Sequence, residues 1–150
     1  MKGMLDHRSS PRANIMTAYI SVSFSARKHI EKELAAINKT LIETEITPHV
    51  FVDIYKFDPS QEQQMMQQAL TDIDKCDLFI AEVSNKAIGI GVEAGYAKAK
   101  GKPVIYIRQP GAEHSTTVSG ISDFQIVYSD PIDLQTQLAA TLRQIKTAGY

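Results

Sequence analysis

Glu93 is the residue whose type and surroundings most strongly indicate chemistry in this chain. It lies within the run D-L-F-I-A-E-V-S-N-K-A-I-G-I-G-V-E-A-G-Y-A, which begins at Asp77. We expect a buried strand over 78–83, a loop that contains Gly89 and Gly91, and then a helix with Glu93 in its first turn. Glycines let a backbone approach a ligand closely, and helix starts offer unpaired N–H groups. The carboxylate could stabilise the helix dipole and do nothing more, or it could be a nucleophile directed at a bound sugar.

Other motifs that carry chemistry are missing from the sequence. G-I-G-V-E is not the G-x-G-x-x-G dinucleotide fingerprint, and neither a phosphate-loop lysine motif nor a G-x-S-x-G elbow occurs. The histidines have no metal-ligand spacing; they are His7, His29, His49 and His114. Cys76 is the only cysteine, which excludes an internal disulfide and a thiolate cluster. We therefore expect neither a metal site nor a cofactor.

The composition is that of an ordinary globular protein. The chain has 150 residues, of which 43% are hydrophobic and 22% charged, and this length suits one domain with a proper core. A net charge of −1 gives no electrostatic reason to expect nucleic acid or membrane as a partner. No apolar run approaches the ~20 residues that span a bilayer, and the start M-K-G-M-L-D-H is not a secretory signal. The expected location is therefore cytoplasmic.

Patterns typical of strands and helices alternate along the chain. Residues 1–15 lack periodicity and predict a flexible N-terminal arm, followed by a single domain over 16–150. Strands are expected over 17–22, 49–53, 78–83, 104–107 and 124–128. Helices are expected after Ser25, as the cap of the first one, and over 61–75, 92–100 and 131–147. This alternation predicts an α/β fold, a flavodoxin-like (Rossmann-like) five-stranded parallel sheet with helices on both faces.

In such folds, ligands bind beyond the carboxyl ends of the strands, near the switch in strand order. The loops after the first, third and fourth strands should line that crevice. They read S-V-S-F-S, S-N-K-A-I-G-I-G-V-E and, in the third case, a loop that contains H-S-T-T. The candidate substrate-binding side chains in these loops are Ser21, Ser23, Phe24, Lys86 and Ser115, beside the two glycines at 89 and 91.

The segment from Asp77 to Pro103, which includes the start of G-K-P-V-I at Gly101, resembles the signature of the nucleoside 2-deoxyribosyltransferases and of the related 2′-deoxynucleoside 5′-phosphate N-hydrolases. A broader resemblance extends over 17–128. It implies N-glycosidic bond chemistry, in which the glutamate matching Glu93 attacks the anomeric carbon of the sugar and expels the base. The glycosyl-enzyme then passes to water or to another base. The resemblance also implies a small-molecule nucleoside or nucleotide substrate and at least a homodimer, because family members borrow site residues from a neighbouring subunit.

Two departures concern partners of the nucleophile. Family members usually carry an aspartate at the position of Ala69; Asp72, one helical turn later, could reach the same space as a catalytic helper. The phosphate-binding serine of the family's P-S-L-G loop matches Ala87, although Lys86 could supply charge. The second phosphate serine of the family aligns best with Ser115.

A third departure lies in the first-strand loop, where the family's ligand-facing glycine is replaced by Val22, which would crowd the pocket. Phe24 could stack on a base. Tyr19 is expected only to pack within the sheet. Three functions stay open at this point: an N-glycosidase, a nucleotide-binding or sensing module that has lost efficient turnover, and a TIR-like NAD glycohydrolase, which Y-I-S-V-S-F-S-A-R resembles.

Overall fold

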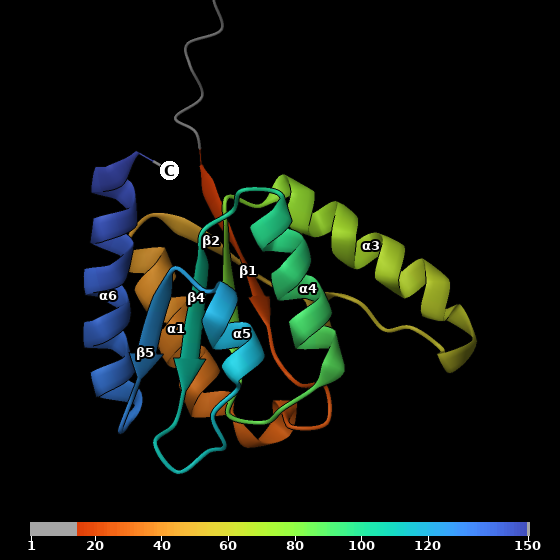
Figure 1. Cartoon of the computed structure of the whole chain (residues 1–150), viewed down its shortest axis with the longest axis horizontal. Coiled ribbons are helices and arrows are strands. Elements are labelled where there is room, and N and C mark those ends of the chain that lie inside the picture. The colour runs from red at the N-terminus through yellow and green to blue at the C-terminus, as the bar shows by residue number, and fades with distance from the viewer. Residues whose placement is uncertain (1–14, 150) are drawn as a thin grey trace, which may run out of the picture.

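Five parallel strands form the centre of the fold (Figure 1), in the order β2-β1-β3-β4-β5. They are β1 (Met16–Ser21), β2 (Ile46–Val50), β3 (Leu78–Glu82), β4 (Val104–Arg108) and β5 (Phe124–Val127). The computed structural model describes residues 15–149, so the flexible arm predicted for the N-terminus falls almost wholly outside the described residues. The strand order and the parallel pairing confirm the predicted flavodoxin-like sheet.

Helices cover both faces of this sheet (Figure 1), as predicted. They are α1 (Glu31–Glu43), α2 (Phe51–Ile54), α3 (Glu62–Lys75), α4 (Ile88–Ala99), α5 (Thr116–Ile121) and α6 (Pro131–Ala148), with short 3-10 turns η1 (Arg27–His29) and η2 (Pro59–Gln61). Buried residues of α1 and α6 join one core cluster, and buried residues of α3, α4 and α5 join the other. The sheet therefore separates two apolar layers.

β1 shows how the strand alternation serves both layers. Ala18 and Ile20 belong to the core beneath α1 and α6, whereas Tyr19 belongs to the core beneath α3 and α4. Successive side chains of a strand point to opposite faces, so Tyr19 and Ser21 emerge on the same face. Both residues are buried, and both lie near the carboxyl end of the strand.

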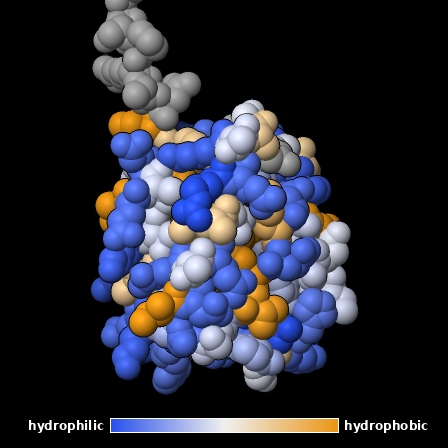
Figure 2. All heavy atoms as spheres, turned by 90° about the vertical axis from the view of Figure 1, so that its left-hand side faces the viewer, coloured by the Kyte–Doolittle hydropathy of each residue, from blue (hydrophilic) through white to orange (hydrophobic). Residues whose placement is uncertain are grey.

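α6 begins at Pro131, as predicted. Asp130 is its N-cap residue, and the side chain of Asp130 accepts a hydrogen bond from the N–H of Asp133. Its inward face is apolar, and the outer face of the molecule over α6 is largely hydrophilic with separate apolar patches (Figure 2). Ile132 is one of its outward apolar residues, at 75% exposed. Within residues 15–149, no helix combines the length and apolar character needed to cross a membrane.

The second strand lies earlier in the chain than predicted. The sequence pattern indicates a strand over 49–53, but β2 ends at Val50 and the next four residues form α2. Pro48, which has no N–H to donate, made the true strand hard to recognise. The sheet tolerates it because β2 is an edge strand that pairs only with β1.

The start of the first helix was also predicted wrongly. Ser25 does not cap it, because the chain first forms η1, and α1 then begins at Glu31 with Ile30 at its N-cap position and no side-chain cap bond. The hydroxyl of Ser25 instead lies 3.1 Å from the hydroxyl of Ser23.

α4 begins at Ile88, four residues earlier than predicted. Gly89 and Gly91 therefore lie in the helix and not in a loop, and Glu93 stands in the second turn and not in the first. Glycine disfavours a helix by about 1 kcal/mol relative to alanine. Burial of the apolar side chains on the inner face of α4 outweighs this cost; these are Ile90, Ala94 and Ala97.

Candidate active site

The Glu93 carboxylate is held by two hydroxyl groups from β1. The hydroxyl of Tyr19 donates a hydrogen bond to Oε2, and the hydroxyl of Ser21 donates one to Oε1 at 3.2 Å. β1 and β3 are neighbours at the point where the strand order reverses, and α4 follows β3 in the chain. Glu93 thus lies at the topological switch point, where open α/β sheets bind their ligands.

Burial and hydrogen bonding act on this carboxylate in opposite directions. Burial raises the pKa of Glu93, and the hydrogen bonds from Tyr19 and Ser21 lower it in part, with a net increase. The pKa of Tyr19 is raised strongly, first by burial and then by the negative charge of Glu93. Tyr19 therefore stays protonated across the physiological pH range and remains a hydrogen-bond donor to the carboxylate.

A cavity of about 580 Å³ opens beside Glu93. Its walls come from the end of β1, from the segment after β2, from α3 and from the start of α4; they are Val22, Phe24, Phe51, Val52, Tyr55, Lys56, Phe57, Met65, Met66, Ala69, Ala87, Gly89, Ile90 and Glu93. We call this space the Glu93 cavity. Val22 forms part of its wall, yet the cavity stays open, so the predicted crowding does not close the site. Phe24 lies at the surface, at 82% exposed.

Gly89 lies directly beside the carboxylate. A Cβ atom at this position would lie 3.9 Å from Oε1 of Glu93, one helical turn away. This distance is an ordinary van der Waals contact, so a side chain here would cover the carboxylate where it faces the cavity. The absence of a side chain keeps this approach open.

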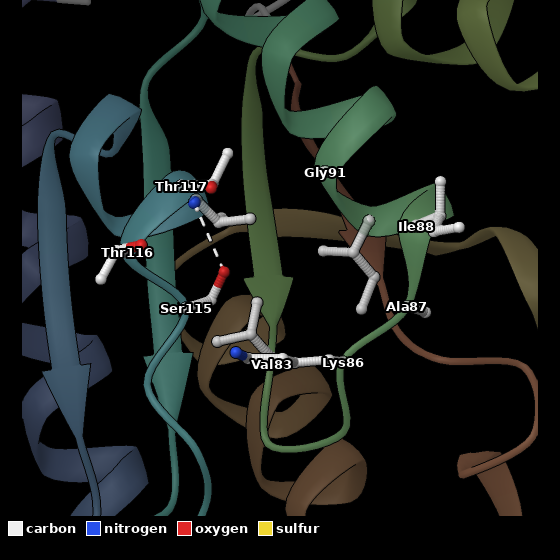
Figure 3. A pocket seen from close by; sticks show the side chains of 10 residues that line it. Val83, Lys86, Ala87, Ile88, Gly91, Ser115, Thr116 and Thr117 are labelled. Carbon is white, nitrogen blue, oxygen red and sulfur yellow. Dashed lines mark hydrogen bonds between the residues drawn. The ribbon is translucent and has the colours of Figure 1, made fainter.

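A second, smaller cavity of about 370 Å³ lies between the N-terminal turns of α4 and α5 (Figure 3). Lys86, Gly91 and Ser115 line it, so three of the predicted substrate-binding residues face this space and not the Glu93 cavity. Two residues line both cavities, Ala87 and Ile90. The two spaces are therefore neighbours on either side of the first turn of α4.

Two of the polar side chains that line the second cavity, Ser115 and Lys86, already have partners. Ser115 is the N-cap of α5, and its hydroxyl accepts a hydrogen bond of 3.5 Å from the N–H of Val118 (Figure 3). The ammonium of Lys86 pairs with the carboxylate of Glu113 at 2.9 Å. A ligand anion in this cavity would have to compete with Glu113 for Lys86.

The structure separates Ala69 from Asp72. Ala69 is a wall residue of the Glu93 cavity, whereas Asp72 is buried and is not among the wall residues. The Asp72 carboxylate instead contacts Nε2 of His49 at 2.9 Å and accepts a hydrogen bond of 2.8 Å from Gln68. The nearby Asp72 carboxylate raises the pKa of Tyr55, which is a wall residue of the cavity.

Tyr19 is the site residue that sequence reasoning missed, because it was assigned to packing alone. Its ring lies between those of His49 and Phe79, with centroid distances of 5.7 and 5.4 Å. Both partners stand opposite Tyr19 in the register of the neighbouring strands. The signal in the sequence was the alternation of Tyr19 with Ser21 on a strand that runs into the predicted crevice.

Two further polar residues near the strand ends have structural roles. Ser23 is buried and lines neither cavity, so the structure does not bring this predicted residue to the ligand space. Glu82 is buried at the end of β3, where it accepts hydrogen bonds from the N–H of Ser84 at 2.7 Å and from the hydroxyl of Tyr128 at 2.8 Å. Among the described residues, no group of three acidic, histidine or cysteine side chains could hold a metal ion.

Comparison with known proteins identifies the family. A model of the protein family described as nucleoside 2-deoxyribosyltransferase matches residues 19–142. A protein of Thermofilum pendens, named provisionally as 2′-deoxynucleoside 5′-phosphate N-hydrolase 1, is 29% identical over 112 residues, which cover 71% of this chain and 78% of that protein.

Solved structures show the same fold. The CMP N-glycosidase of Clostridium botulinum has a TM-score of 0.61 and 18% identity, over 81% of this chain and 97% of its own. The 2-deoxyribosyltransferase of Bacillus psychrosaccharolyticus has a TM-score of 0.61 and 15% identity, over 79% of this chain and 90% of its own. The family match, which covers most of the sequence, shows that this chain belongs to the nucleoside 2-deoxyribosyltransferase family, whose members cleave or transfer N-glycosidic bonds.

Proposed function

We propose that this protein cleaves the N-glycosidic bond of a nucleoside or nucleotide, with Glu93 as the nucleophile. The observation that carries the proposal is the placement of the Glu93 carboxylate, which faces a ligand-sized cavity while both of its oxygens accept hydrogen bonds from β1. Membership of the family supports the type of bond. The identity of the nucleophile and of the substrate belongs to the proposal.

The reaction has two steps. An oxygen of Glu93 attacks the anomeric carbon of the sugar while the bond from that carbon to the base nitrogen breaks; the bonding electrons leave with the base, which takes up a proton. The product is a sugar ester of Glu93. Water or a second base then attacks the same carbon, the ester oxygen leaves with its electrons, and the carboxylate is restored as the incoming group loses a proton.

Tyr19 and Ser21 position the nucleophile. Their hydroxyl groups fix the orientation of the carboxylate, and they favour its ionised form against the effect of burial. Partial burial in turn keeps the pKa of Glu93 above the ordinary range of glutamate. The carboxylate must be ionised to attack, so activity requires a pH above this raised pKa.

The departing base lacks an acid at the position where the family usually carries one. Ala69 stands there, and the nearby Asp72 is occupied by His49 and Gln68. We assign Asp72 to positioning, because it holds His49 against the ring of Tyr19. The proton for the base then comes from water, which makes turnover slow.

The second cavity is the proposed place for a 5′-phosphate, if the substrate carries one. Lys86 would bind it as a cation after leaving Glu113, and Ser115 and the backbone at Gly91 would lie beside it. In the family, the second phosphate serine, which aligns with Ser115, is lent by a neighbouring subunit, so we also propose a homodimer. Sedimentation of the protein at several concentrations measures this directly, and a monomer throughout would contradict it.

Base release from a panel of deoxynucleosides and deoxynucleoside 5′-monophosphates tests the proposal. The wild-type protein should release base, and Glu93→Gln should reduce the rate by at least about a thousandfold, as expected for loss of a nucleophile. Glu43→Gln, at the end of α1, is the matched control and should leave the rate unchanged. Equal rates in all three proteins would contradict the role of Glu93.

A binding or sensing module is the second candidate, and Ala69 favours it specifically. This function predicts that the same compounds bind but that no base is released in a single turnover with enzyme in excess. Release of even one equivalent of base within such an experiment would contradict it.

A further inference from the structure

The Glu93 cavity is far more apolar than its proposed chemistry requires. Of its fourteen wall residues, only Glu93 and Lys56 carry a charge. Glu93 lies on α4, whereas most of the apolar wall comes from the segment after β2 and from α3. The carboxylate and most of the apolar wall therefore come from different elements of the fold, and we call the part of the cavity lined by the segment after β2 and by α3 the apolar end.

Three aromatic rings line the apolar end. The ring centroids of Phe51 and Tyr55 are 4.9 Å apart, those of Tyr55 and Phe57 5.7 Å, and those of Phe51 and Phe57 6.1 Å. The only hydroxyl group among them is that of Tyr55, and the nearby Asp72 carboxylate raises its pKa, so the hydroxyl keeps its proton. The three rings supply the apolar surface of this end.

Two methionines of α3 complete this end. Met65 and Met66 are half-buried wall residues, together with the small side chain of Ala69. Methionine is flexible and polarizable, so it adapts to apolar groups of irregular shape. The aromatic rings and these residues form what we call the apolar pocket: Phe51, Tyr55, Phe57, Met65, Met66 and Ala69.

This lining has a consequence for the base. A site built to hydrogen-bond a polar group strongly rejects compounds that lack that group, whereas an apolar pocket gains affinity with each buried carbon. Apart from Tyr55, the side chains of this lining offer no hydrogen-bond partner to the polar edge of an unsubstituted base, and burying that edge without a partner costs binding free energy. An apolar substituent on that edge would instead bury carbon against the rings and the methionine sulfurs.

We propose that the Glu93 cavity takes a nucleoside whose base carries an apolar substituent, and that the apolar pocket binds this substituent. The inference rests on the proposed function for the placement of the sugar at Glu93. It adds the class of base, which the family match leaves open. The sugar lies at the carboxylate, and the base extends towards α3 and the segment after β2.

The size of the effect follows from burial. Each buried methylene is worth about fourfold in affinity, so a fully buried propyl group is worth about 60-fold. Because the cavity is partly open, we expect a preference of at least about tenfold for a propyl-substituted compound over its unsubstituted parent. Substitution of Phe57, a half-buried ring of the pocket, by serine should reduce this preference to below about threefold.

Calorimetric binding to the Glu93→Gln protein tests this without turnover. The ligands are two pairs: 2′-deoxyadenosine with its N6-propyl derivative, and 2′-deoxyuridine with its 5-propyl derivative. Binding is repeated after adding Phe57→Ser or, as a second pocket variant, Met66→Gln. Ile132→Ser, which changes an exposed apolar residue of α6, is the matched control and should leave the preference unchanged.

The proposal is supported if the propyl compound of either pair binds at least about tenfold more tightly than its parent and if both pocket variants, once shown to be folded, reduce this preference. Equal affinity within both pairs, no binding of any of the four compounds, or a preference that survives in the pocket variants would overturn it. Base release by the wild-type protein is measured separately. Selective binding without base release would refute the role of Glu93 but would leave the assignment of the apolar pocket intact. Base release without selectivity would refute the assignment of the apolar pocket but would leave the role of Glu93 intact.

Discussion

Tyr19→Phe removes one atom from the site and tests how Glu93 is held. The variant keeps the ring that packs between His49 and Phe79, and it deletes the hydroxyl that donates to Oε2 of Glu93. The carboxylate is then left with one donor, the hydroxyl of Ser21 at 3.2 Å. Any change in stability or activity therefore reports on this hydrogen bond and not on lost packing.

The magnitude follows from the charge of the acceptor. A hydrogen bond to a charged group contributes about 1.5–3 kcal/mol to stability. For a protein of this size, each kcal/mol corresponds to about 2–4 °C, so the melting temperature should fall by about 3–12 °C at neutral pH. The lost bond had lowered the pKa of Glu93, so this pKa should rise further in the variant.

The pH dependence separates this cause from ordinary destabilisation. Glu93 is ionised above its pKa, where the loss is greatest, and neutral below it, where only a weaker bond is lost. The difference in stability between wild type and Tyr19→Phe should therefore shrink as the pH falls through the pKa of Glu93. The acid limb of the pH profile for base release should shift to higher pH in the variant.

Thermal unfolding followed by circular dichroism at neutral and acidic pH measures the first effect, and kcat/KM against pH measures the second. Tyr128→Phe is the matched control, because it deletes the same kind of bond to another buried carboxylate, that of Glu82. It should destabilise the protein but leave the acid limb in place. If Tyr19→Phe destabilises the protein equally at both pH values and leaves the acid limb unshifted, the hydroxyl of Tyr19 does not support the ionised form of Glu93.

Three further predictions concern single residues. Glu93→Gln should raise the melting temperature by a few degrees at neutral pH, because it removes a carboxylate whose pKa is raised by burial. This gain in melting temperature should vanish below the pKa of glutamate in the unfolded chain, which is about 4.3. A lower melting temperature at neutral pH would contradict this prediction. Ala69→Asp should speed base release by about tenfold or more, because it supplies an acid for the departing base. If the single-turnover rate is no higher than that of the wild type, water is not the limiting proton source in the present site. Cys76 should stay unmodified by a thiol reagent in the folded protein and react fully in denaturant, because burial raises the pKa of its thiol to about 12; rapid reaction of the native protein would show that α3 opens there.

The sheet could be predicted because its strands carry a strong local signal. Runs such as those of β3 and β4 are short, apolar and flanked by polar residues, which indicates strands buried on both faces. β2 carried no such signal, because Pro48 interrupts it and the next residues are equally apolar. Its position depends on pairing with β1, a contact that lies outside the local pattern.

The glycines beside Glu93 were harder to interpret. Local propensity indicated a loop at Gly89 and Gly91, but burial of Ile90 and Ala94 against the sheet holds these residues in α4. This placement moves Glu93 away from the helix start, where the dipole acts on a carboxylate. The hydroxyl groups of β1 hold it instead, and no spacing within one segment could have predicted that contact between residues more than seventy positions apart.

The helper residues could not be ranked from sequence. Ala69 and Asp72 are one helical turn apart, and only the packing of α3 decides which of them faces the cavity. Lys86 and Ser115 were expected near the nucleophile, yet the first turn of α4 separates their cavity from that of Glu93. Both results depend on how elements pack together, which the sequence pattern does not specify.

Direct detection of the sugar ester on Glu93 tests whether this residue is the nucleophile. The protein is mixed in excess with a deoxynucleoside, the reaction is stopped with acid during the first turnover, and peptides are mapped by mass spectrometry. We expect one deoxyribosyl group on the peptide that contains Glu93, formed together with released base and absent from Glu93→Gln. Released base with no ester at Glu93, an ester at another residue, or no released base at all would contradict this expectation.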